Sequence, residues 1–127
     1  MKELSRAEIQ DVQDIQERKV EIPDWKGFIF CRTPNGFERD QFETDVLNMR
    51  SNEEPQNIRG LCMARFAYDS KGRRVFTDDD ADWLGRKSSR ALNIFFEVYQ
   101  ELGGITEEEL KDLEKRLEGN ESDGGQS

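Results

Sequence analysis

Residues 88–102, SSRALNIFFEVYQEL, decide the fold of this chain. Within them, large apolar residues recur at the spacing that places side chains on one face of an α-helix. These residues are Leu92, Phe95, Phe96, Tyr99 and Leu102. Ser88 or Ser89 can cap the first turn, and Gly103-Gly104 predicts the end of the helix. We therefore predict one long helix with a strongly apolar face.

A second apolar row widens this face beyond what one packed layer covers, and it consists of Ala91, Ile94 and Val98. A helix that is apolar over so much of its circumference is either central in its domain or shared with a partner. Both interpretations can hold together in a small domain, and the sequence leaves them open.

The part of the chain before residue 34 divides into an arm and a strand pair. Residues 1–18 contain the Ser5-x-x-Glu8 pattern of a capped helix start, followed by a narrow apolar stripe of Ile9, Val12 and Ile15. Residues 20–33, VEIPDWKGFIFCRT, predict two short strands around a turn. Trp25 in that turn is expected to anchor packing.

Helices are predicted for most of the remaining chain. Phe42, Val46 and Met49 favour a helix over about residues 36–50, and residues 56–68 favour another, in which Gly60 marks a close helix contact or a weak point. A turn at 69–72 precedes a capped helix beginning at Thr77. A last helix begins near Thr106, with a single row of Leu110, Leu113 and Leu117.

We therefore predict a mainly α fold with a small β-hairpin, of class α+β. It is a compact helical domain of five to six helices with a two-stranded element near residues 19–33. The predicted organisation is an N-terminal helical arm at 1–18, a domain at 19–118 and a disordered tail at 119–127.

Composition restricts the possible partners. The chain has 28 acidic and 19 basic residues, a formal charge of −9, which argues against a nucleic-acid or anionic-membrane surface. No apolar run approaches the length of a membrane-spanning helix, and no signal peptide is evident. Cys31 and Cys62 lie in apolar runs, which predicts two buried thiols in a protein of a reducing compartment. A cytosolic protein is expected, and only 34% hydrophobic content means that self-association would help its stability.

The case for an enzyme is weak. The chain has no histidine, which removes the commonest general base and metal ligand, and its two separated cysteines do not form a zinc pattern. The run Asp78-Asp79-Asp80-x-Asp82 does not have the spacing of a calcium loop and is better explained as helix capping. No glycine-rich phosphate loop is present. We expect no enzyme, no cofactor and no metal, with carboxylate-only catalysis as a weaker alternative.

A series of motifs resembles the tail assembly chaperones of long-tailed bacteriophages over roughly residues 4–118. In chain order they are 20–27 (VEIPDWKG), 31–32 (CR), 36–39 (GFER), 64–66 (ARF), 69–72 (DSKG), 75–80 (VFTDDD), 83–84 (WL) and 87–88 (KS). The family pattern is Val-x-Val-Pro-x-Trp-Gly where this chain inserts Lys26, and its long helix closes with Leu-Asn-Gly instead of Leu102-Gly103-Gly104. These departures affect only the register of the first motif and the end of the long helix. They remove no catalytic group, because the family has none.

The resemblance implies a non-enzymatic role in the host bacterial cytoplasm. Such chaperones coat the tape measure protein, keep it soluble, help recruit major tail protein and are absent from the mature virion. A longer frameshifted form supplies the contact with major tail protein in many of them. Residues expected to contact the partner, with core packing as the alternative, are Phe95, Phe96, Tyr99, Leu102, Trp83 and Phe76. A different hypothesis is a small acidic phage or prophage regulatory protein that binds and inhibits a host protein.

Overall fold

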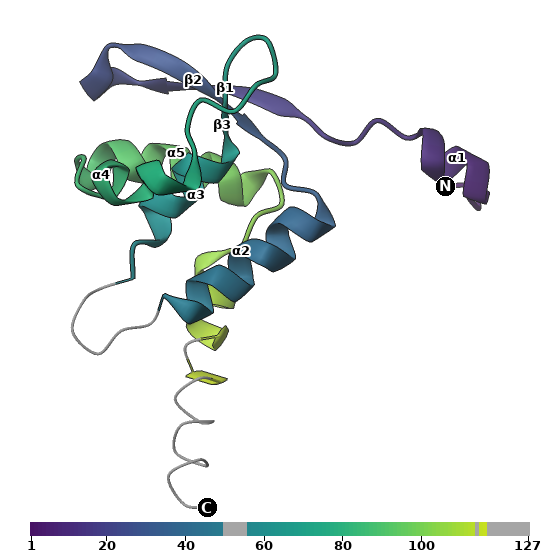
Figure 1. Cartoon of the computed structure of the whole chain (residues 1–127). Coiled ribbons are helices and arrows are strands. Elements are labelled where there is room, and N and C mark those ends of the chain that lie inside the picture. Colours follow the sequence, from purple (N-terminus) through teal and green to yellow (C-terminus); the bar gives the residue numbers. More distant parts are fainter. Residues whose placement is uncertain (50–55, 114, 117–127) are drawn as a thin grey trace, which may run out of the picture.

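A computed structural model describes residues 1–49, 56–113 and 115–116 (Figure 1). It is an α+β domain, which confirms the predicted fold class. Its antiparallel sheet has the strand order β1-β2-β3, formed by Glu17–Ile22, Gly27–Arg32 and Ala67–Tyr68. Helix α5 (Ser89–Glu101) packs against β1 and β2 of this sheet, α3 (Ile58–Phe66) packs on α5, and α4 (Ala81–Gly85) packs on α3.

The predicted strand pair is present as a hairpin, with Val20 opposite Ile29. Its turn is a short 3₁₀ helix, η1 (Pro23–Trp25), which ends at Lys26 in the left-handed conformation with φ of 55°. The sequence did not predict the third strand. The helix expected over residues 56–68 ends at Phe66, because Ala67 and Tyr68 pair instead with Cys31 and Phe30 of β2.

Helix α5 forms the centre of the core, as one of the two interpretations of its apolar face predicted. The ring of Tyr99 stacks on Phe66 at 4.8 Å and on Phe96 at 5.9 Å between centroids, while Phe42 meets its edge at 5.6 Å. Ser88 caps the first turn by accepting a hydrogen bond from the backbone N–H of Ala91. This face is covered on one side by the sheet and on the other by α3.

Helices α3 and α4 approach each other closely around one asparagine. The Asn57 side chain donates to the Ala81 carbonyl at 2.7 Å and accepts from the Gly60 backbone N–H at 3.2 Å. A Cβ atom at Gly60 would lie 2.6 Å from the Ala81 carbonyl oxygen, and one at Gly85 would lie 2.2 Å from the Asn57 amide oxygen. Gly60 therefore marks a close helix contact, one of its two predicted meanings.

Two further parts complete the described chain. Helix α2 (Gly36–Asn48) begins with a capping box between Asn35 and Glu38, and it lies beside a helix over residues 107–113, to which Arg39 connects it through Glu109. Helix α1 (Arg6–Asp11) begins with the predicted Ser5–Glu8 capping box and lies away from the rest of the molecule (Figure 1). The polar break at 51–55, Leu117 and the tail at 119–127 lie outside the described residues.

Candidate functional site

The structure divides the six expected contact residues into two groups. Four of them lie in the core: Phe95, Phe96, Tyr99 and Leu102 are exposed by only 1%, 2%, 0% and 7%. Of the two interpretations that the sequence leaves open for the apolar face of α5, the structure shows core packing for these four residues. The fold covers that face with its own sheet and helices, so these four side chains present almost no free surface in the monomer.

Trp83 and Phe76 make up the second group. Trp83 is 46% exposed, and the neighbouring Val75 is also exposed. The ring of Phe76 meets the Trp83 ring edge-on, with 5.7 Å between the ring centroids. The Trp83 indole N–H donates to the Asp80 carboxylate at 2.9 Å, which fixes the ring orientation. We call Val75, Phe76 and Trp83 the aromatic patch. A rigid aromatic with one polar contact is typical of an anchor residue in protein interfaces.

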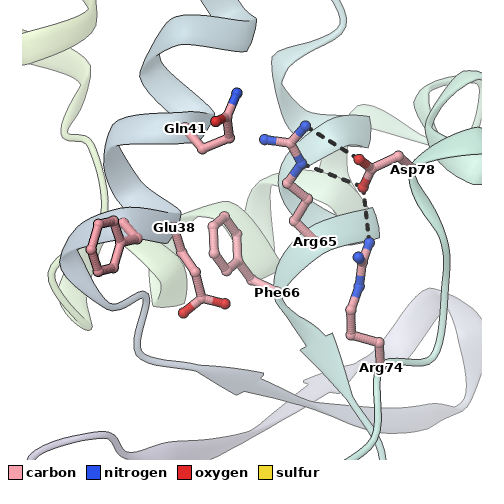
Figure 2. Close-up of a pocket in the computed structure, with 7 residues that line it drawn as sticks. Glu38, Gln41, Arg65, Phe66, Arg74 and Asp78 are labelled. Atoms are coloured by element: carbon pink, nitrogen blue, oxygen red, sulfur yellow. Dashed lines mark hydrogen bonds and ion pairs between the residues drawn. The ribbon is translucent and has the colours of Figure 1, made fainter.

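An open pocket of about 390 Å³ lies between α2, the end of α3 and the segment that leads into η2 (Asp78–Asp80). Figure 2 shows Arg65 and Arg74 directed at the carboxylate of Asp78, with Glu38 and Gln41 on the facing helix. Apolar surface comes from Phe66 and from Phe37, whose side chain is 90% exposed. We call this site the arginine pocket; its residues are Phe37, Glu38, Gln41, Arg65, Phe66, Arg74 and Asp78.

The sequence did not predict this pocket, although one signal was present. Phe37 stands outside the row of Phe42, Val46 and Met49 that faces the core, so a large aromatic on that helix had no predicted packing partner. The carboxylate partners of Arg65, Asp45 and Asp78, lie 20 and 13 residues away along the chain. Such distant pairs are set by tertiary packing and carry no local pattern.

The carboxylate of Asp78 is held in its charged form. Partial burial alone would raise its pKa, but hydrogen bonds from Arg74 and Arg65 and their positive charges outweigh burial and lower the pKa below its ordinary value. Hydrogen bonds from the Thr77 backbone and the Trp83 indole likewise lower the pKa of Asp80. Neither group is therefore suited to accept a proton at neutral pH, and both act as structural anions.

Replacing Arg65 with Met is expected to lower the free energy of unfolding by about 1.5–3 kcal/mol at pH 7, because charge-assisted hydrogen bonds to two carboxylates are lost. The Asp78 contribution is fully present above the pKa of that group in the unfolded chain, about 3.9. It disappears as the pH falls through the lower pKa in the folded chain. The stability difference between wild type and Arg65→Met should therefore shrink below pH 4 in denaturant titrations.

The isosteric variant Asp78→Asn is the control for this pH dependence. Its own acid titration should be flatter than that of the wild type below pH 4, because the titrating carboxylate is gone. A difference between wild type and Arg65→Met that stays constant from pH 7 to pH 3 would contradict the assignment.

The two cysteine thiols, Cys31 and Cys62, are both buried. Burial raises the pKa of the Cys31 thiol to about 12 and that of Cys62 well above its ordinary value, so both stay protonated and are poor nucleophiles. Across residues 1–49, 56–113 and 115–116, no three Cys, Asp or Glu side chains gather as a metal site would require.

Comparison of the chain with protein-family models, with curated proteins and with solved structures gave no significant match. Within the described part of the chain, none of the helices has both the length and the apolar character needed to cross a membrane.

Proposed function

We propose that this protein is a non-enzymatic assembly chaperone of bacteriophage tails. It binds the tape measure protein in the host cytoplasm, keeps it soluble and helps recruit major tail protein, the last through a longer frameshifted form. The main support for the proposal is that the motifs that resemble the family lie, in chain order, at the ends of strands and helices and in turns. The VEIPDWKG motif spans the end of β1 and the hairpin turn, CR ends β2, GFER begins α2 and ARF ends α3. DSKG forms the turn after β3.

The tape measure contact is proposed at the aromatic patch and not on α5. A tape measure protein is a long amphipathic helix that aggregates when exposed, so its chaperone must offer apolar groups to it. Trp83 and Val75 provide these at the surface, with the partly buried Phe76 against the Trp83 ring, whereas the α5 residues are already packed. Many copies binding along one helix gain avidity, so each contact can be modest in area.

Co-expression with the tape measure protein of the same phage tests this proposal. The wild-type chain is expected to raise the soluble fraction of that protein, and Trp83→Ser is expected to abolish most of the effect. Truncating a central aromatic anchor weakens an interface by about 2 kcal/mol, roughly thirtyfold in Kd. Soluble tape measure protein is measured by quantitative gel analysis, and Kd by titration with a soluble tape measure segment.

The chain offers a matched control, because its other tryptophan, Trp25, is 37% exposed in the hairpin turn. Trp25→Ser removes the same side chain from a different surface and should leave solubilisation unchanged. Circular dichroism confirms that both variants are folded. If the wild type does not increase soluble tape measure protein, the chaperone proposal is wrong. If both tryptophan variants behave as wild type does, the contact lies elsewhere than the aromatic patch.

A further inference from the structure

Strand β1 forms one edge of the sheet, because β2 is its neighbour on one side and the strand order begins with β1 (Figure 1). In an antiparallel pair, the backbone groups of successive residues point alternately toward the partner strand and away from it. The N–H of Thr33 donates to the carbonyl of Gln16 at 2.8 Å, so the even-numbered residues of β1 are the ones that bond to β2. The backbone N–H and C=O groups of Glu17, Lys19 and Glu21 therefore point away from the sheet.

These outward backbone groups form a row along an unbroken strand. No residue that the structure describes makes a hydrogen bond to the backbone of Glu17, Lys19 or Glu21, and all three residues are exposed. The strand has six residues without a proline, and its pairing with β2 runs without a bulge. Such an edge is a template for one more extended strand, because only a strand places donors and acceptors at the matching interval.

The charges on β1 favour a second copy of the same strand in one register. If Lys19 lies opposite the Lys19 of a second copy, the two lysines repel each other, and Glu17 lies opposite Glu21. If Lys19 lies opposite Glu17, Arg18 lies opposite a second Arg18. If Lys19 lies opposite Glu21, opposite charges pair on the outer face, and Val20 lies opposite Val20 on the inner face. The third register alone combines opposite charges outside with an apolar pair inside.

The two charged side chains are available for this contact. Within one copy, the Lys19 ammonium lies 3.7 Å from the Glu21 carboxylate, and the side chains are exposed by 52% and 76%, so the ion pair contributes little. The ammonium also lies 4.2 Å from the centroid of the Phe28 ring, on the outer face of the sheet. In the third register each lysine gains the carboxylate of the other copy, and the four charges alternate in sign. A lysine in the middle of an edge opposes pairing with strands that lack such a carboxylate.

We propose that two copies of this chain associate through their β1 strands, with Lys19 of each copy opposite Glu21 of the other. The backbone groups of these two residues bond reciprocally, so the two sheets join into one continuous sheet with two-fold symmetry. A strand pair buries little area, so we expect weak association, with a Kd on the order of 1–100 µM. The contact does not involve the aromatic patch, so Trp83 stays free to bind another protein.

Charge-reversal variants of the full chain test both the contact and its register. Lys19→Glu and Glu21→Lys each place like charges opposite each other across the strand pair, so each variant alone should associate at least tenfold more weakly than the wild type in sedimentation velocity. An equimolar mixture of the two variants brings opposite charges together again, so pairs of about 30 kDa, twice the 14.8 kDa chain, should return. The double variant should associate as the wild type does. Circular dichroism confirms that each variant is folded.

Lys71→Glu is the matched control, because it makes the same change of charge in the exposed turn after β3. It should associate as the wild type does. Amide hydrogen exchange tests the backbone contact: at concentrations above the Kd, the N–H groups of Lys19 and Glu21 should exchange more slowly than in dilute protein. The N–H of Val20, which already faces β2 opposite Ile29, should show no such change.

Three results would each overturn the proposal: a wild type that stays monomeric at millimolar concentration, a Glu21→Lys variant that associates normally, or a mixture of the two variants that stays monomeric. All of these measurements use the chain alone. Their outcome is therefore independent of whether the protein solubilises a tape measure protein.

Discussion

Replacing Tyr99 with Ala is expected to lower the free energy of unfolding by about 3–5 kcal/mol, the usual range for deleting a buried aromatic side chain. The ring is fully buried and lies against the rings of Phe42, Phe66 and Phe96, so its removal leaves a cavity that no neighbour can fill. Small domains have about 5–15 kcal/mol of stability in total. Urea denaturation followed by circular dichroism should therefore show a large fall in the midpoint.

Tyr99→Phe is the matched control for this prediction. It keeps the ring and removes only the hydroxyl, which accepts a hydrogen bond from the buried Ile105 backbone N–H at 3.3 Å. The expected loss is about 1 kcal/mol. Tyr99 was also a predicted partner-contact residue, and this pair of variants separates the two roles. A Tyr99→Ala protein with wild-type stability and lost partner binding would contradict the core assignment.

Local features were predictable from the sequence wherever their cause is local. The capping boxes at Ser5–Glu8 and Asn35–Glu38 depend on side chains three residues apart, and both are present. The Ser88 cap and the glycine end of α5 follow from the same short-range rules, since Gly103 has the positive φ of 103° that favours glycine. The strand pair also follows from alternation around a proline turn.

Features that depend on distant partners were missed for a physical reason. Periodicity says that α5 has a wide apolar face, but it does not say how much surface β1, β2 and α3 bring to cover it. The short strand at Ala67 exists only because β2 has a free edge beside it. The arginine pocket joins residues from α2, α3 and the segment before η2, so no spacing along the chain indicates it.

Of the six expected contact residues, those on α5 and those near η2 carried the same kind of sequence signal. Large aromatic residues at helical spacing occur in cores and in interfaces alike, because both bury apolar area. What separates Trp83 from Phe96 is that α4 has only five residues and has no sheet packed over its outer side, so its tryptophan stays exposed. The position of an element in the fold decides the role, and that position is a tertiary property.

Replacing Gly104 with Ala is expected to cause the second large loss, about 1–3 kcal/mol or more. A Cβ atom at this position would lie 2.3 Å from two carbon atoms of the Tyr99 ring. That ring cannot move aside, because Phe66 and Phe96 stack against it. Alanine also reduces the freedom of the unfolded chain, which favours folding by about 0.4–1 kcal/mol, so the clash must outweigh this gain. Thermal and urea denaturation measure the net loss.

Gly103→Ala is the neighbouring control, since no atom lies within 4 Å of its added Cβ and only its positive φ opposes the change, by about 1–2 kcal/mol. A double-mutant cycle then isolates the ring contact. In a Tyr99→Leu background, which removes the ring, Gly104→Ala should cost less than in the wild type, with a coupling of about 0.5–3 kcal/mol. Gly103→Ala should cost the same in both backgrounds. Additive losses for Gly104→Ala would mean that the glycine is needed for its backbone alone and not for the approach of the Tyr99 ring.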